Sequence, residues 1–189
     1  MPQHFLNRLP LVFPSAVIST VIETESPAEL KKLNDALETL KQQDPTLQGI
    51  SGDTRQTLIN GTSEQHLEGI KNRLLREFGL AVKFHKPQVN YCEVVTDAAE
   101  TVLFEPVMKL TIETPADYHG DFIGDLQRRR ASIAKTVQHD KMITIEAHVP
   151  LKELLGYSHV VFNLGQGQAR CEMELLSYAP APPEPPGFG

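Results

Sequence analysis

Apolar positions in the first part of the chain recur first with strand spacing and then with helix spacing. Residues 17–25 are rich in Val, Ile and Thr, the β-branched residues that suit a half-buried strand. Ser26 and Pro27 then form a typical helix start, and leucines recur at helical spacing up to the Asp44-Pro45 break. We therefore predict a strand followed by a helix with one apolar side.

The remainder of the first half predicts a hairpin, a second amphipathic helix and a fourth strand. In chain order these are strands at 47–51 and 56–60 around a turn at 52–54, a helix capped by Thr62 or Ser63 and closed by Gly79, and a strand at 81–85 that ends before Pro87. The first half is therefore predicted to have the order β-α-β-β-α-β.

The second half repeats this order. Met108, Leu110 and Ile112 alternate with polar residues, which is typical of a strand with one buried face. The elements that follow are a helix from Thr114-Pro115 with Tyr118, Phe122, Ile123 and Leu126 on its apolar side, strands on both sides of His139-Asp140 up to Pro150, a helix over 151–162, a turn at Gly165-Gln166-Gly167, and a strand from Ala169. The predicted fold class is α+β, with two tandem ferredoxin-like βαββαβ sandwiches.

Composition fits a soluble protein of the cytoplasm. The chain has 189 residues and a formal net charge of −6, and no apolar run reaches the roughly 20 residues that cross a bilayer. Its N-terminal stretch lacks the pattern of a signal peptide. Cys92 and Cys171 stand far apart, which argues against a disulfide framework or a zinc site. We expect no membrane partner, and the sequence indicates no particular oligomeric state.

Motifs that carry chemistry are missing from the sequence. It contains no GxxxxGK[ST] phosphate loop, no HExxH motif and no GxSxG motif. The Gly165-Gln166-Gly167 string lies between a helix and a strand, the reverse of a nucleotide-binding context, so it is interpreted as a turn. His66 lies among carboxylates, and a packing or capping role is favoured over acid–base chemistry. We predict no catalytic residue, cofactor, nucleotide or metal.

One basic group is a candidate contact for RNA phosphates. Arg128, Arg129 and Arg130 end a predicted helix, and Lys109 and His119 lie on neighbouring elements. A structural interpretation competes with this one, because Asp125 stands at the spacing of intrahelical ion pairs with Arg128 and Arg129. Both interpretations stay open at this point.

Strings in both halves resemble elongation factor G, the translational GTPase that drives translocation on the ribosome. The strings that resemble its third domain are Phe13-Pro14, Asp44-Pro45-Thr46, the helix start at 61–68 and Lys86-Pro87-Gln88-Val89 with Tyr91 and Glu93. Those that resemble its fifth domain include Glu105 to Lys109, Gly120-Asp121, Ile123 to Arg130, Gly156-Tyr157, Gln166-Gly167 and Met173-Glu174. The family's first, second and fourth domains, and with them its GTP site, have no counterpart.

The resemblance implies a domain organisation and a partner. We expect an extension at 1–12, a domain III-like unit at 13–93, a connector at 94–104, a domain V-like unit at 105–178 and a flexible Pro-rich tail at 179–189. The expected partner is the ribosome, through rRNA and ribosomal proteins near the factor-binding site. The expected function is that of a non-catalytic ribosome-binding module.

Some positions depart from the family's pattern. Phe162-Asn163 and Gln168 stand where the family usually has basic residues, which removes phosphate contacts. A protein–protein interaction module, or a remnant of a translational GTPase that no longer binds rRNA, are therefore the alternative functions.

Overall fold

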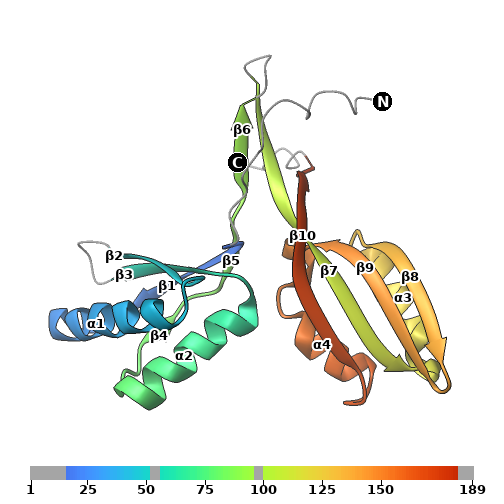
Figure 1. Ribbon diagram of the computed structural model, residues 1–189, viewed down its shortest axis with the longest axis horizontal. Helices are drawn as coiled ribbons and strands as arrows, with labels where there is room; N and C mark the ends of the chain where they lie inside the picture. The colour runs from blue at the N-terminus through green and yellow to red at the C-terminus, as the bar shows by residue number, and fades with distance from the viewer. Residues whose placement is uncertain (1–15, 52–55, 96–99, 183–189) are drawn as a thin grey trace, which may run out of the picture.

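The computed structural model describes residues 16–51, 56–95 and 100–182, and these form two lobes side by side (Figure 1). Each lobe has one antiparallel sheet, and helices cover one face of it. The α+β class with two ferredoxin-like units is confirmed. No helix in the described residues has the length and apolar character needed to span a membrane.

The first lobe has the strand order β2-β3-β1-β4, and β5 also pairs with β1. Helices α1 and α2 pack on one side of this sheet, as Figure 1 shows. Its elements are β1 (Ile18–Glu23), α1 (Pro27–Gln43), β2 (Gln48–Ser51), β3 (Gln56–Gly61), α2 (Glu64–Phe78), β4 (Lys83–Phe84) and β5 (Gln88–Val89).

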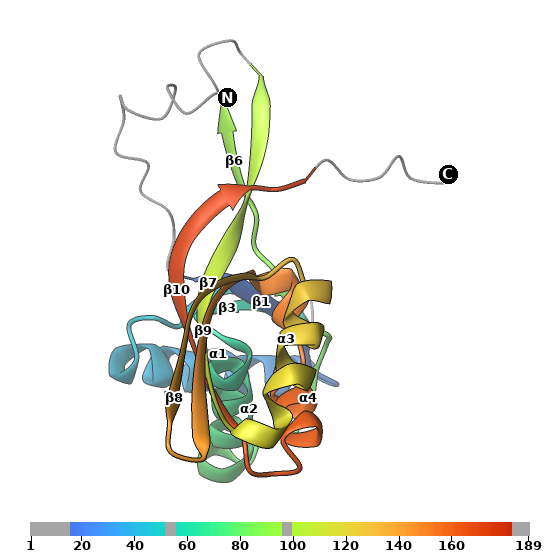
Figure 2. The ribbon, with the colours of Figure 1, turned by 90° about the vertical axis from the view of Figure 1, so that its right-hand side faces the viewer.

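The second lobe has the strand order β10-β7-β9-β8, with β6 paired to the start of β7. Helices α3 and α4 lie on the same side of this sheet (Figure 2). Its elements are β6 (Cys92–Val95), β7 (Thr101–Pro115), the 3-10 helix η1 (Ala116–Tyr118), α3 (His119–Arg128), β8 (Ser132–His139), β9 (Met142–Pro150), the 3-10 helix η2 (Leu151–Leu154), α4 (Tyr157–Leu164) and β10 (Arg170–Pro180).

Local sequence explains where the first-lobe helices begin and end. Ser26 Oγ caps α1 by accepting a hydrogen bond from Glu29 N–H, and the Glu29 carboxylate accepts one from Glu25 N–H, the residue before the cap. Ser63, rather than Thr62, caps α2. Gly79 ends α2 with a φ of 64°, a left-handed conformation that glycine adopts without steric cost.

Three predicted elements differ from the structure. The fourth strand of the first lobe is two short pieces, β4 and β5, on either side of Pro87, and both pair with β1. The helix expected over 151–162 is divided into η2 and α4, because Gly156 takes a φ of 72° between them. The last strand, β10, continues to Pro180 and so includes the start of the expected tail.

The stretch expected to be a connector is mostly strand. β6 and the first residues of β7 form an antiparallel hairpin that rises above both lobes as an arm (Figure 1). The end of β10 joins this arm, since Pro180 pairs with Phe104 and Ala181 N–H donates to the Leu103 carbonyl at 2.8 Å. Residues 1–12 and the turn at 52–54 lie outside the described residues.

The lobes contact each other through the N-terminus of α2. Glu64 Oε2 accepts a hydrogen bond from the Gly156 N–H at 2.7 Å, directly before α4. Gln65 Nε2 donates to Ser158 Oγ at 2.9 Å. A carboxylate next to a helix N-terminus also interacts favourably with the helix dipole. The polar contact therefore fixes the start of α4 against the start of α2.

Candidate functional site

Arg130 is held by carboxylates of its own lobe. Its guanidinium donates to both carboxylate oxygens of Glu105, at 2.8 and 3.1 Å, and to Glu153 at 3.1 Å. Hydrogen bonding to Glu105, reinforced by Glu153, raises the pKa of Arg130. Glu105 is only 4% exposed, so this two-pronged pair neutralises a buried charge at the base of the arm. A positive φ of 56° at Arg130 turns the chain there.

Arg129 is also engaged inside the lobe. Its Nε donates to Asp125 Oδ2 at 2.7 Å, and Nη1 donates to the Glu153 carbonyl at 2.6 Å. The guanidinium carbon lies 4.7 Å from the centre of the Tyr157 ring, a cation–π distance. Tyr157 is fully buried, and burial together with the charge of Asp125 raises its pKa. Arg129 therefore holds α3 against η2 and α4.

Arg128 is the member of the triplet that faces solvent. Its side chain is 76% exposed, and its closest ion-pair contact is with Asp125 Oδ1 at 3.7 Å. The intrahelical pairs expected from Asp125 are thus present for both Arg128 and Arg129. Exposed pairs of this kind are weak, so Arg128 stays able to meet an external phosphate.

Lys109 and His119 lie apart from the arginines. Lys109 is on the sheet face opposite the helices, opposite His148 in register, and its Nζ lies 3.2 Å from Glu174 Oε1. Hydrogen bonding to Glu174 raises the pKa of Lys109. His119 begins α3, whereas the arginines lie at its other end, and the His119 Nε2 is buried with no hydrogen-bond partner among the described residues. The structure does not gather the predicted site residues into one patch.

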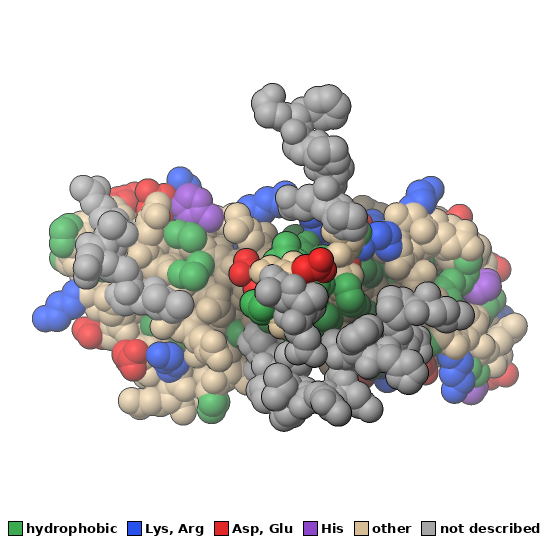
Figure 3. Space-filling model, turned by 90° about the horizontal axis from the view of Figure 1, so that it is seen from above, with side chains coloured by type: hydrophobic (Ala, Val, Ile, Leu, Met, Phe, Trp, Pro, Cys, Tyr) green, Lys and Arg blue, Asp and Glu red, His purple; other side chains and the backbone are tan. Residues whose placement is uncertain are grey.

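Charged side chains are also dispersed over the face seen from above in Figure 3. Lys and Arg side chains are scattered over that face among Asp and Glu, and hydrophobic side chains gather at its centre around the arm. Two described hydrophobic residues of the arm are exposed, Val95 at 70% and Leu103 at 42%.

Sequence reasoning missed a second group of basic residues, in the first lobe. Lys71, His85 and Lys86 line a hollow of about 240 Å³ between α2 and the segment from β4 to Pro87. Lys71 bonds to Glu68 at 3.2 Å, and His85 Nε2 lies 3.0 Å from Glu23 Oε2. Lys86 follows β4 in a loop, and no helical spacing in the sequence relates it to Lys71.

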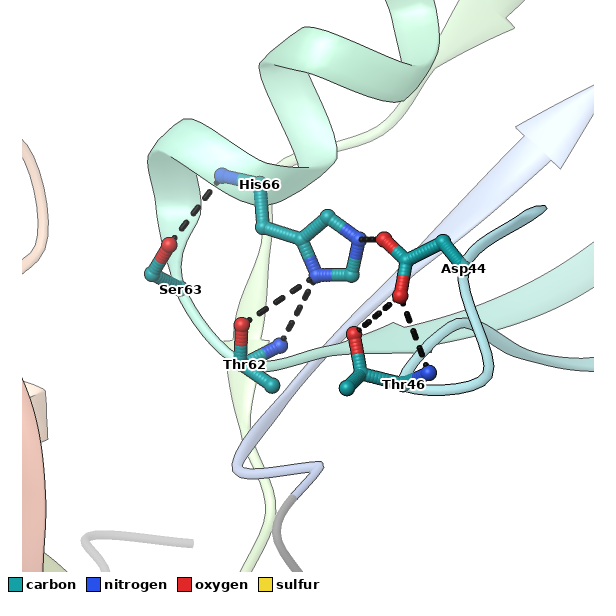
Figure 4. A network of polar contacts seen from close by, with 5 residues as sticks. All are labelled: Asp44, Thr46, Thr62, Ser63 and His66. Carbon is teal, nitrogen blue, oxygen red and sulfur yellow. Dashed lines mark hydrogen bonds and ion pairs between the residues drawn. The ribbon is translucent and has the colours of Figure 1, made fainter. Parts of the chain in front are cut away.

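His66 has a structural role in the first lobe (Figure 4). Its Nδ1 accepts a hydrogen bond from Thr62 N–H at 3.1 Å, so the ring proton is assigned to Nε2, which lies 2.9 Å from Asp44 Oδ2. This oxygen lies off the line of the ring N–H, so the contact is short but poorly aligned. Asp44 is the C-cap of α1, and the contact links the end of α1 to the start of α2.

The same geometry argues against acid–base chemistry at His66. Thr62 Oγ1 is 3.3 Å from Nδ1, which resembles a hydroxyl beside a base. That nitrogen already accepts the Thr62 N–H, so it has no free lone pair to take the hydroxyl proton. A Cβ at Gly61 would come within 2.9 Å of His66 Nδ1, so the missing side chain of Gly61 leaves room for the imidazole ring. The packing interpretation of His66 agrees with these contacts.

The described residues contain no group of three or more His, Cys, Asp or Glu side chains that could hold a metal ion. Cys92 and Cys171 are both free thiols, and burial raises the pKa of Cys171, which makes it less reactive.

Comparison with known protein families shows to which family the chain belongs. Residues 13–86 match the family model for elongation factor G domain III, and residues 102–187 match the model for the elongation factor G C-terminus. The chain belongs to the elongation factor G family. Its two lobes correspond to these two elongation factor G domains.

Curated elongation factor G proteins align with most of this chain. Elongation factor G of Thermotoga maritima is 26% identical over an alignment 279 residues long, and elongation factor G 2 of Desulfotalea psychrophila is 27% identical over one of 277. Each alignment covers 90% of this chain but 40% of the relative. The chain therefore spans well under half the length of these relatives. Because both alignments are longer than the 189-residue chain, parts of each relative have no counterpart here.

A solved structure gives the same fold. A crystal structure of a protein from Thermus thermophilus superposes with a TM-score of 0.61 and 19% identity, covering 87% of this chain and 41% of that one. At 19% identity, this structural similarity is evidence for the fold alone.

Proposed function

We propose that the chain is a non-catalytic, cytoplasmic ribosome-binding module of the translation machinery. The observation that carries the proposal is the match of both lobes to elongation factor G domains, together with relatives named elongation factor G. Neither matched model is a GTP-binding domain, and the sequence has no phosphate loop. The proposed partners are rRNA and ribosomal proteins near the factor-binding site.

The charges indicate how such binding works. A net charge of −6 opposes broad attachment to phosphates. Arg128 is the most exposed arginine of the triplet and has the longest contact with a carboxylate, so it is the cation that an rRNA phosphate can reach. We propose a local contact that weakens as salt increases.

The experiment is co-sedimentation of the purified chain with ribosomes over a range of salt concentrations. Arg128→Ala is expected to weaken binding and to lower the salt slope by about one unit, as the loss of one phosphate contact does. Lys31→Ala, which removes an exposed cation from α1, is the matched control. Wild-type protein that stays in the supernatant at low salt would refute ribosome binding.

A protein–protein module is the second candidate. The exposed Val95 and Leu103 of the arm and the acidic net charge favour it. A partner that is captured equally well after RNase treatment, from extracts in which ribosomes fail to co-sediment, would support this candidate.

A third candidate keeps the family link but makes the chain dependent on other domains. The chain covers 40% of its relatives, which fits a part of a translational GTPase that acts with partner domains supplied in trans. Ribosome binding that appears only when the missing domains are added would favour it.

A further inference from the structure

The strand β6 has one edge without a partner among the described residues. Its other edge pairs with β7, from Cys92 opposite Phe104 to Val95 opposite Thr101. Val95 is 70% exposed, and Leu103 on β7 is 42% exposed. An open edge presents unpaired backbone donors and acceptors, and native proteins usually cover or block it. The arm therefore has room for one more strand.

The first described residues of the chain lead to this edge. β1 and β5 are antiparallel, with Ile18 opposite Val89, and β6 rises directly from β5 (Figure 1). The pairing continues past both strands, because Asn90 N–H donates to the Val17 carbonyl at 2.9 Å. Asn90 Nδ2 also donates to the carbonyl of Ala16, the first described residue, at 3.1 Å. The ladder between β1 and β5 thus ends at the foot of β6.

The register of β1 and β5 can be continued backwards from β1. Residues 12–15 then come to lie opposite residues 92–95, which are the whole of β6. Val12 faces Val95, the exposed end of that strand. These four residues precede β1 directly in the chain, so no extra loop has to be closed to bring them there.

The sequence of this segment suits a strand at the edge of a sheet. Residues 11–13 are Leu, Val and Phe, which are apolar. Phe13 would face Val94, and such pairs of an aromatic and a β-branched residue stabilise sheets. Pro10 and Pro14 have no backbone N–H, so the outer edge of the added strand would offer few donors to another chain.

We propose that residues 12–15 dock on the free edge of β6 as an antiparallel strand and so complete the sheet of the arm. Backbone hydrogen bonds hold the segment, and the alternation of its side chains sets the register. Val12 covers Val95, and Phe13 joins the apolar face of the arm at Val94. This docking takes place within the chain and does not depend on ribosome binding.

Two features favour this segment over a second copy of the chain. A second β6 would bring another Glu93 to the same edge, and like charges that meet across strands are destabilising. Residues 1–15 contain no Asp or Glu, and they include Arg8. The segment is also joined to β1 through Ala16, so its docking loses less translational freedom than the association of two chains does.

Engineered disulfides test the register. The background lacks both natural thiols, through Cys92→Ala and Cys171→Ala. Val12→Cys and Val95→Cys then place two thiols on directly opposite residues. Opposite residues of an antiparallel pair have Cα atoms roughly 4.5–5.5 Å apart, within the range of a disulfide. We expect a disulfide inside the monomer, identified by mass spectrometry of the linked peptides.

The matched control moves one thiol by a single residue. Val12→Cys with Val94→Cys keeps the tether almost unchanged but directs the two side chains to opposite faces of the sheet. This pair should form the disulfide several-fold more slowly. Equal rates, or no disulfide in either pair, would overturn the proposal. Disulfides between two chains that increase with protein concentration would identify a second copy as the occupant and would also overturn it.

Amide hydrogen exchange tests the docking without added thiols. Phe13→Ser should speed the exchange of the β6 amides, because it removes the side chain that packs beside Val94, and it should leave α3 and α4 unchanged. Gln3→Ser changes a residue of the same segment outside the docked strand and is the matched control. Exchange in β6 that is the same in both variants and wild type would contradict the docked strand.

Discussion

The two lobes have the same order of elements but stabilise it in different ways. In the first lobe the last strand is two short pieces around Pro87, and the helices are tied by the His66–Asp44 contact near the surface. In the second lobe the last strand runs along β7 from Arg170 to Pro180, and arginines paired with buried carboxylates fix the helices. The same topology is thus stabilised by different kinds of interaction in the two lobes.

The difference also changes how the arginines are interpreted. In the second lobe the charges that look most suited to a partner mostly hold the lobe together, and replacing Arg128, Arg129 and Arg130 at once would test folding as much as binding. A single substitution at Arg128 avoids this difficulty, since its side chain is exposed.

The largest effect is expected from the second lobe. Arg130→Ala leaves the carboxylate of Glu105 buried without its partner, and should lower the free energy of unfolding by about 3 kcal/mol. Arg128→Ala, the matched control, should change it by less than about 0.5 kcal/mol. Chemical denaturation measures both variants. If Arg130→Ala proves as mild as the control, the buried pair does not hold the lobe.

A smaller effect is expected in the first lobe. His66→Ala removes the acceptor of the Thr62 N–H and the neighbour of Asp44, and should cost about 1–2 kcal/mol. Hydrogen exchange should show loss of protection in the first turn of α2 and little change in the second lobe. Uniform loss of protection over both lobes would contradict the local role assigned to His66.

The contact between the lobes should contribute less still. Glu64→Ala removes the acceptor for Gly156 N–H at the start of α4, and should destabilise the chain by about 1 kcal/mol. Because this bond couples the lobes, their thermal transitions should move apart in calorimetry. Gln65→Ala removes the neighbouring side-chain bond to Ser158 and should show a weaker version of the same change. Unchanged, coincident transitions in both variants would show that the lobes are coupled elsewhere.

The smallest effect at neutral pH is expected at Tyr157. Its buried hydroxyl has no aligned hydrogen-bond partner among the described residues, so Tyr157→Phe should change stability by less than about 1 kcal/mol.

The same substitution should matter at alkaline pH. Burial, followed by the charge of Asp125, raises the pKa of Tyr157 above its ordinary value of 10.0, so the folded state keeps the phenol proton longer than the unfolded state does. Stability from this group is present below pH 10.0 and is lost as the pH rises above it. Tyr157→Phe should lose less stability than wild type in that range. Identical alkaline profiles would contradict the shift.

Much of the fold is visible in the sequence because its signals are local. Ser26-Pro27, Ser63 and Gly79 mark helix ends through bonds to residues within a few positions, and the alternation in β7 and β9 shows their buried faces. The helical spacing of Asp125 likewise predicts its pairs with Arg128 and Arg129.

The parts that sequence reasoning missed depend on distant partners. Nothing near Arg130 in the sequence indicates Glu105, which lies on β7. The sequence predicts a connector in place of the arm. β6 is short, and its pairing with β7 depends on tertiary context rather than on local sequence signals. β10 reaches Pro180 because Phe104 and Leu103 offer it a partner strand, which overrides the disordering tendency of a Pro-rich end.

We propose that the chain contacts ribosomal RNA, and chemical footprinting of ribosomes with and without the protein is the decisive measurement. We expect protection in the factor-binding region of the large subunit, and we expect Arg128→Ala to weaken it. Identical footprints with and without saturating wild-type protein would contradict it.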